Sequence, residues 1–221
     1  MIFVVYFDIL PVLFAYFMLF IQSDGTSFST KSRLRAAASF AFEVVKIVVI
    51  SLAIIIPVRY FLIQPFYVKG ASMEPNFYNY EYLIIDEFTY RFTAQPSRGD
   101  IVVFHPPTDD TEFFIKRVVG LPGETVTIGE GKVRVMNAEY PLGVTLDESA
   151  YLPTGLATEG NQTVVLEPQT YFVLGDNRGA SLDSRSFGPV TSNQIVGRAL
   201  FRGWPFNRIT VFASPQYNVP R

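Results

Sequence analysis

The chain has 221 residues, which is enough for one domain or for one domain with a membrane anchor. Hydrophobic residues make up 49% of it and charged residues only 17%, below the ~25% of typical globular chains, and this excludes a disordered or strongly charged protein. The net charge of −2 excludes a generally basic surface for nucleic acid.

The first apolar stretch covers residues 1–21, which hold one charge, Asp8, and one proline, Pro11. About 20 apolar residues is the length that a bilayer core requires. A signal peptide would have a basic start and a cleavage site with small residues, and neither is visible. We therefore predict a transmembrane helix over residues 1–21. The alternative is a segment that is cleaved or does not span.

A second apolar stretch covers residues 44–63 and is rich in isoleucine and valine. Lys46 and Arg59 lie near its ends, where long side chains can reach the lipid headgroups. We predict a second transmembrane helix here, and the alternative is a buried core helix. Residues 22–43 then form a loop, in which residues 33–42 are compatible with a short amphipathic helix along the headgroups.

The loop over residues 22–43 carries Lys31, Arg33 and Arg35. Because positively charged loops stay on the cytoplasmic side, the part that follows is predicted to lie on the extracytoplasmic side of the cell membrane. This orientation holds whether or not residues 1–21 span. The sequence therefore predicts a multi-pass membrane protein with an external domain.

Residues 64–221 are predicted to form one β domain, because short β-branched and aromatic runs recur between turn signals. The predicted strands are 82–86, 101–105, 113–119, 124–128, 132–136, 163–166, 170–174 and 195–201. About eight strands must hide their edges, which favours a closed or nearly closed antiparallel barrel. The predicted fold class is mainly β, with an antiparallel barrel-like catalytic domain after two transmembrane helices.

Three segments of this domain carry reactive side chains. In Gly70-Ala71-Ser72, small residues let a substrate backbone approach a serine, although a serine needs a nearby base and a plain turn serine is the alternative. In the strand around Lys116, alternation places this lysine on an apolar face with Phe114, where loss of hydration would lower its pKa and suit it as a general base. The alternative is a Lys116 that faces solvent.

The third segment, Gly175 to Arg185, is dense in turn formers, aspartate and arginine. It is either a rigid loop that holds catalytic strands in register or a solvated loop with weak ion pairs. Arg117 points away from Lys116 and needs a carboxylate. A fourth segment, Arg98 to Phe104, is a turn leading into a strand, and we interpret it as structural.

These four segments, in this order and after a membrane span, resemble the bacterial type I signal peptidases. GASMEP resembles the serine motif of that family, RGDIVVF and KRVVGLPGE resemble the next two motifs, and GDNRGASLDSRSFG resembles the last. GRALFRGWP also looks like the closing strand of the family. The resemblance covers about residues 44–212.

The resemblance implies that Ser72 is the nucleophile and Lys116 the general base. The supporting residues that it implies are Ser181 bonded to the lysine amine, an Asp183–Arg185 ion pair, and an Asp176–Arg117 pair. Two positions depart from the family pattern. Gly70 stands where some members have a hydroxyl residue, so the oxyanion would be held mainly by backbone N–H groups, including that of Ser72, in the Gly70 region. Asn76 stands where threonine usually follows Pro75, and we expect it to cap or bridge a local turn.

The function implied is that of a membrane-bound serine endopeptidase. It would remove signal peptides from secretory precursors through an acyl-enzyme, with small residues preferred one and three positions before the cut. The implied partners are these precursors and the phospholipid membrane, with no metal, cofactor or nucleic acid. The aromatic residues expected at the membrane interface are Phe66, Tyr67, Phe77, Tyr78 and Tyr80.

Two other functions compete with this one. Soluble self-cleaving repressors also use a serine and a lysine, but the two predicted spans and the lack of a basic helix-turn-helix argue against them. A non-catalytic envelope scaffold that binds exported chains is disfavoured, because both Ser72 and Lys116 are present. The absence of cysteine excludes disulfides, thiol catalysis and thiolate metal sites, and the single histidine, His105, argues against a Ser-His-Asp mechanism and excludes a polyhistidine metal site.

Overall fold

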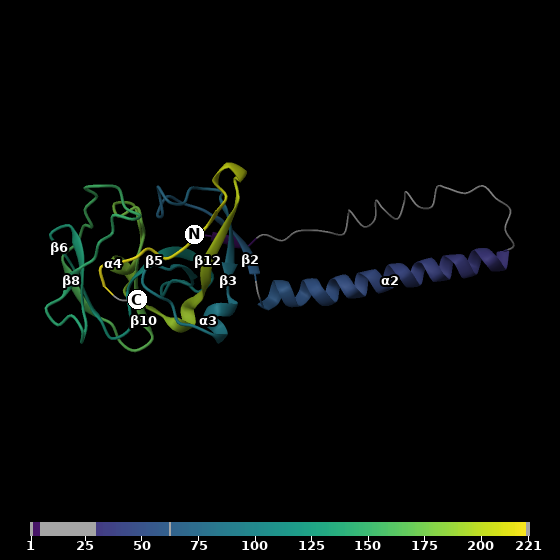
Figure 1. The fold of residues 1–221 in the computed structure, drawn as a ribbon, viewed down its shortest axis with the longest axis horizontal. Coiled ribbons are helices and arrows are strands. Elements are labelled where there is room, and N and C mark those ends of the chain that lie inside the picture. The colour runs from purple at the N-terminus through teal and green to yellow at the C-terminus, as the bar shows by residue number, and fades with distance from the viewer. Residues whose placement is uncertain (1, 5–29, 62, 220–221) are drawn as a thin grey trace. The chain divides into compact units, whose positions relative to one another are not determined.

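The computed structural model describes residues 2–4, 30–61 and 63–219 (Figure 1). The chain divides into two units, one made of residues 5–61 and the other of residues 1–4 and 62–221, which we call the β unit.

Helix α2 (Thr30–Phe61) accounts for the described part of the first unit. Its stretch Ala38–Ile56 is long and apolar enough to cross a membrane. The separate amphipathic helix predicted over residues 33–42 is not found, because α2 runs through it without a break. Three consecutive alanines (36–38), and the absence of glycine or proline between Thr30 and Ile56, favour this continuity.

The first predicted span is not confirmed. Residues Ile2–Val4 form strand β1, which pairs with β2 (Ile63–Val68) in antiparallel register, and residues 5–21 lie outside the described residues. Short apolar runs with β-branched residues do not distinguish a strand from a helix by periodicity alone.

The main sheet of the β unit holds nine antiparallel strands in the order β1-β2-β3-β12-β4-β5-β10-β11, with β13 paired to β12. Its remaining strands are β3 (Tyr82–Asp86), β4 (Ile101–Phe104), β5 (Phe114–Gly120), β10 (Thr170–Leu174), β11 (Val190–Thr191), β12 (Ile195–Trp204) and β13 (Thr210–Val211). The short helices are α3 (Phe88–Phe92), α4 (Ser184–Phe187), η1 (Ser192–Gln194) and η2 (Phe206–Arg208).

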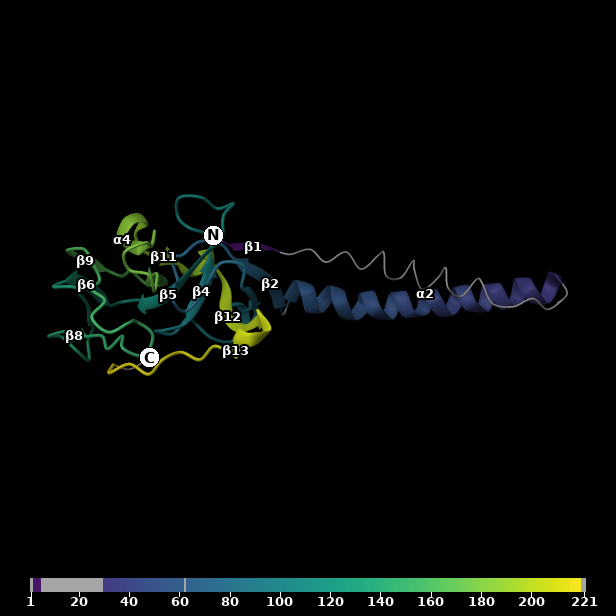
Figure 2. The same ribbon diagram turned by 90° about the horizontal axis from the view of Figure 1, so that it is seen from above.

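A second sheet holds four strands in the order β8-β7-β6-β9. They are β6 (Thr125–Gly129), β7 (Lys132–Met136), β8 (Val144–Thr145) and β9 (Gln162–Val165). In both views β6 and β8 lie at the end of the β unit opposite to β2 (Figures 1 and 2).

The mainly β, antiparallel class is confirmed, and the barrel, predicted to be closed or nearly closed, is a half-barrel accompanied by a second sheet. The described strand pairs leave β1 and β11 at opposite ends of the main sheet. The arrangement of the main sheet is decided by pairing between strands that are far apart in the sequence. The first part of β12 pairs with β4 and the rest with β3, across register shifts in the ten-residue strand. No local pattern contains that information.

The segment that carries Ser72 is anchored in the apolar core of the β unit. Met73 and Phe77, 1% and 0% exposed, pack in one cluster with Phe66 and neighbouring strand residues. Phe66 and Phe77 were expected at the membrane interface, so that prediction is corrected: their large apolar surfaces fill the core instead. Tyr80 is 72% exposed, as an interfacial residue would be.

Candidate active site

Ser72 lies in a tight turn between β2 and β3, which we call the serine turn (residues 70–77). Backbone N–H groups of Asn76 and Phe77 donate to the Met73 carbonyl at 3.0 and 2.9 Å. The buried side chains of Met73 and Phe77 anchor the turn in the core, whereas Ser72 is partly exposed.

Lys116 lies on β5, between β4 and β10, and is only 2% exposed. Its Nζ is 2.8 Å from Ser72 Oγ and 2.9 Å from the Ile115 carbonyl oxygen. Burial lowers the Lys116 pKa to about 8, and the carboxylates of Asp183 and Asp176 oppose this shift. The structure thus brings the two residues together, with an amine that can lose its proton near neutral pH.

Arg117, on the opposite face of β5, is buried and pairs with buried Asp176. Its Nε and Nη2 donate to the two carboxylate oxygens at 2.8 and 2.7 Å, and its Nη1 donates to the Gly99 carbonyl at 3.0 Å. The guanidinium also stacks on the Tyr151 ring, 4.0 Å from its centroid. Burial opposes the charge of Arg117, but Asp176 outweighs burial and raises the arginine pKa.

The loop over residues 175–185, which we call the Asp-Arg loop, is bonded to the serine turn. The Asn177 backbone N–H donates to the Ser72 carbonyl, and its Nδ2 donates to the Ala71 carbonyl, both at 3.0 Å. Within the loop, Arg185 Nε donates to Asp183 Oδ1 at 2.8 Å. Burial opposes ionisation of Asp183, but the Arg185 side chain and the Gly175 N–H together lower its pKa. The loop is therefore an ordered part of the site rather than a solvated surface.

The predicted bond between Ser181 and Lys116 is not found. Ser181 Oγ is buried and has no hydrogen-bond partner of good geometry among the described residues, although Ser181 contributes to the lowered pKa of Asp183. The reason is placement: the Lys116 amine is engaged by Ser72 and Ile115, while the Ser181 hydroxyl lies over Gly175.

One predicted oxyanion donor, the N–H group of Gly70, already takes part in another hydrogen bond. The Gly70 N–H donates to Asn79 Oδ1 at 2.6 Å, so it is not available to a substrate oxygen. Gly70 has φ of +102°, a conformation that glycine adopts without strain and that orients its N–H toward Asn79. In the described part of the chain, no hydrogen bond uses the Ser72 N–H, which stays the candidate donor.

Sequence reasoning missed Asn177 and Tyr151 as neighbours of the serine and the arginine. Asn177 lies inside the GDNRGASLDSRSFG motif, so the sequence did point to its N–H donors. Tyr151 comes from the segment between β8 and β9, the least patterned part of the chain, and no sequence signal pointed to it. The single histidine, His105, bonds through Nδ1 to the Glu112 carbonyl at 3.0 Å. Over the described ranges, no group of three or more metal-ligating side chains is found.

Gly175→Ala is expected to lower the rate of any reaction at the Ser72 hydroxyl by about 10²-fold, because small displacements of reacting groups cost rates of that order. An added methyl group would overlap the Ser181 hydroxyl and the Ser72 carbonyl oxygen. The comparison is Gly179→Ala in the same loop, where an added methyl group meets nothing within 4 Å. Initial rates of both variants at equal folded concentration check this, and equal rates would contradict the close packing at Gly175.

Comparison with known proteins identifies the family. The family model described as signal peptidase, peptidase S26, matches residues 41–204. The probable signal peptidase I-2 of Synechocystis sp. is 38% identical over 76% of this chain and 75% of its own length. A signal peptidase I of Leptolyngbya laminosa is 35% identical over 81% of this chain and 87% of its own, and signal peptidase I T of Bacillus subtilis is 32% identical over 85% and 98%. With the four motifs gathered around one serine and one lysine, the chain belongs to the bacterial type I signal peptidases.

Proposed function

We propose that this protein is a membrane-bound serine endopeptidase that removes signal peptides from exported precursors, with Ser72 as nucleophile and Lys116 as general base. Family membership supports the reaction class. The residue assignment rests on one observation, the 2.8 Å separation between the Nζ of buried Lys116 and the Oγ of partly exposed Ser72. A non-catalytic scaffold is not favoured, since it would have no need of such a pair.

The proposed reaction has two acyl-transfer steps. Neutral Lys116 accepts the Ser72 proton as Oγ attacks the carbonyl carbon of the last signal-peptide residue, and the Ser72 N–H donates to the oxyanion. The C–N bond breaks, and the Lys116 ammonium gives its proton to the leaving amine. A water molecule, deprotonated by the same amine, then attacks the ester carbonyl. The bond between the acyl carbon and Ser72 Oγ breaks, Oγ takes the proton back from Lys116, and the signal peptide leaves with a free carboxyl group.

Different observations support the membrane anchor, the orientation of the catalytic domain and the substrate preference in this proposal. The apolar stretch Ala38–Ile56 of α2 supports an anchor in the bilayer. The positive charges of Lys31, Arg33 and Arg35, ahead of this stretch, support a catalytic domain on the extracytoplasmic side. Preference for small residues at positions −1 and −3 of the precursor is carried by the family resemblance.

The decisive experiment incubates the full chain in detergent with a precursor that carries its signal peptide. We expect a single cut at the end of the signal peptide, identified by the mass of the new N-terminus. A precursor with tryptophan in place of the small residue at −1 should stay uncut. The Ser72→Ala protein is the blank. Binding of the precursor without any cut by the unaltered protein would refute the proposal and favour a scaffold.

Activity is expected to rise with pH through a midpoint near 8, the value to which burial lowers the Lys116 pKa. Only the neutral amine can accept the Ser72 proton, so kcat/KM should fall about tenfold for each pH unit below the midpoint and level off above it. The measurement is a pH profile of kcat/KM over the range in which the protein stays folded. A midpoint at the ordinary lysine value would contradict the lowered pKa, and a flat profile would count against Lys116 as the base.

A further inference from the structure

We propose that Asn76 is a positioning residue that holds the serine turn against the Asp-Arg loop, so that Ser72 Oγ stays within reach of Lys116. This inference deepens the proposed function and rests on it. Asn76 does not contact Lys116 in any described hydrogen bond, so it would act through other groups.

The Asn76 amide uses both of its N–H donors on two distant segments. Nδ2 donates to Asp176 Oδ2 at 2.8 Å and to the Tyr151 carbonyl oxygen at 2.8 Å. Its own backbone carbonyl accepts a hydrogen bond from Arg202. The expectation that Asn76 caps a local turn is therefore incomplete, because its side chain makes tertiary rather than local bonds.

The acceptor of the first bond is already part of the site. Asp176 Oδ2 also accepts from Arg117 Nη2 at 2.7 Å, so Asn76 completes the coordination of a buried carboxylate. The next residue, Asn177, donates to the Ser72 carbonyl. The serine turn is thus bonded to the Asp-Arg loop at three residues: Ala71 and Ser72 through Asn177, and Asn76 through Asp176.

The acceptor of the second bond brings in a segment outside the four motifs. Tyr151 accepts through its carbonyl, covers Arg117 with its ring, and donates through its hydroxyl to Glu148 at 2.6 Å. Glu148 in turn pairs with buried Arg178 of the Asp-Arg loop at 2.5 Å. The Asn76 amide therefore links the serine turn to Asp176 and to Tyr151, both of which contact the buried Arg117 side chain.

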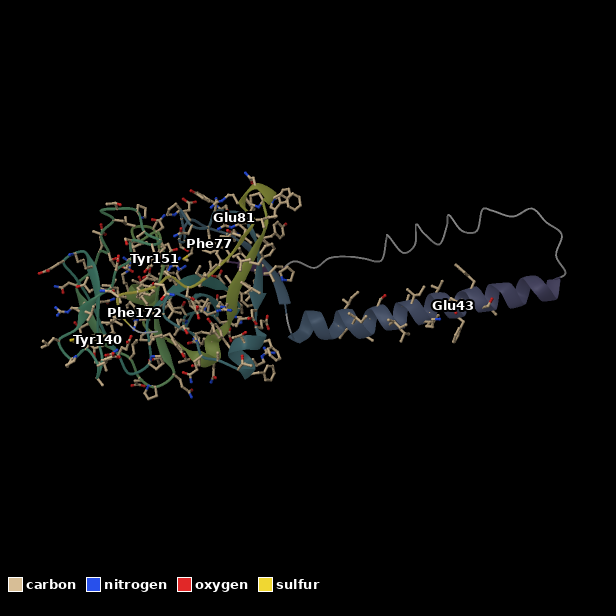
Figure 3. All side chains as sticks on the ribbon, in the orientation of Figure 1. Glu43, Phe77, Glu81, Tyr140, Tyr151 and Phe172 are labelled. Atoms are coloured by element: carbon tan, nitrogen blue, oxygen red, sulfur yellow. The ribbon has the colours of Figure 1, made fainter. Side chains whose placement is uncertain are left out.

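The other side of the serine turn is held by a second set of charges. Arg202, which bonds the Asn76 carbonyl, pairs with buried Glu81 at 2.8 Å and lies 5.1 Å from the Phe77 ring centroid. Figure 3 labels Phe77, Glu81 and Tyr151 within the β unit. With the turn fixed by Arg202 and by the core, the Asn76 amide is the contact that sets its distance from Asp176.

The test compares Asn76→Ala, which removes both donors, with Asn76→Thr, which retains a single hydroxyl donor. We expect kcat for precursor cleavage to fall about 10²-fold in Asn76→Ala while KM stays within about threefold, because misplacement of the nucleophile affects the chemical step. Asn76→Thr should recover part of the loss. Full-length proteins in detergent are used, and thermal unfolding midpoints are recorded for each so that rates refer to folded protein.

Asn218→Ala is the matched control. This exposed residue also makes two hydrogen bonds, to Thr145 O at 2.9 Å and from Asp147 N at 3.0 Å, and touches no member of the site in the described bonds. Its kcat should equal that of the unaltered protein. An Asn76→Ala kcat within about threefold of normal would overturn the inference, as would a loss accounted for by unfolded protein alone. If Asn76→Ala does not fold, a folded Asn76→Thr with normal kcat overturns it equally.

A Ser72→Ala protein assayed in parallel separates this inference from the proposed function. Cleavage by Ser72→Ala would refute the proposed function and the inference together. An inactive Ser72→Ala beside a fully active Asn76→Ala would leave the proposed function standing and refute the inference alone.

Discussion

Lys116→Met is expected to lower kcat for precursor cleavage on the order of 10⁶-fold, the loss that follows removal of the base in other serine peptidases. Methionine has nearly the length of lysine and suits a buried position, but it cannot accept a proton. The Lys116 amine is the group that lies 2.8 Å from Ser72 Oγ. The measurement is the precursor-cleavage rate of the purified full chain.

The stability of this variant makes the test specific. Removing a buried amine spares the cost of desolvating it, so the free energy of unfolding should not fall. The control is Lys132→Met on the exposed start of β7, which should cleave normally. A Lys116→Met protein that is folded and still cleaves at a normal rate would show that another group accepts the serine proton.

Asp176→Ala is expected to lower the free energy of unfolding by about 3–5 kcal/mol, a large share of the 5–15 kcal/mol of a typical domain. The substitution leaves the Arg117 guanidinium buried without its counter-charge. It also removes the acceptor of the Asn76 amide. The measurement is chemical unfolding of the full chain in detergent, beside exposed Asp110→Ala, which should change stability by about 0.5 kcal/mol or less.

A double variant distinguishes a lost ion pair from a lost contact. If the isolated charge of Arg117 causes the damage, Arg117→Met combined with Asp176→Leu should be more stable than Asp176→Ala alone by about 1 kcal/mol or more, since apolar replacement of a buried pair is often neutral. Activity should not return, because Asn76 and Gly99 lose their partners. A double variant less stable than the single one would refute this account.

Most strands could be predicted because alternation of apolar residues is a local property. The ranges 82–86, 132–136 and 170–174 coincide with β3, β7 and β10. The sheet order could not be predicted in the same way, since β12 lies between β3 and β4 although it is far from both in the chain. That pairing depends on contacts over about a hundred residues, which short windows do not record.

In the site too, features that depend on the local sequence could be predicted, and contacts between distant segments could not. Alternation along β5 correctly placed Lys116 on a buried face and Arg117 on the other, because side chains alternate along any strand. The predicted Ser181–Lys116 bond is not found among the described contacts, and it depends on the position of one loop residue relative to a distant strand. The positions of Phe66 and Phe77 were wrong, because composition alone does not separate an aromatic residue in the core from one at an interface.

By itself, the sequence determined the family and the mainly β character of the chain that follows the apolar stretch, and it supplied the proposal that Ser72 and Lys116 are the reacting pair. Motif order and residue alternation are read along the chain, so they need no coordinates. Only the tertiary structure decided that the sheet is open, that Gly70 is already bonded, and that residues 76, 151 and 176 meet. Those contacts arise where separate segments pack against one core, and their partners follow from three-dimensional packing rather than from neighbours in the chain.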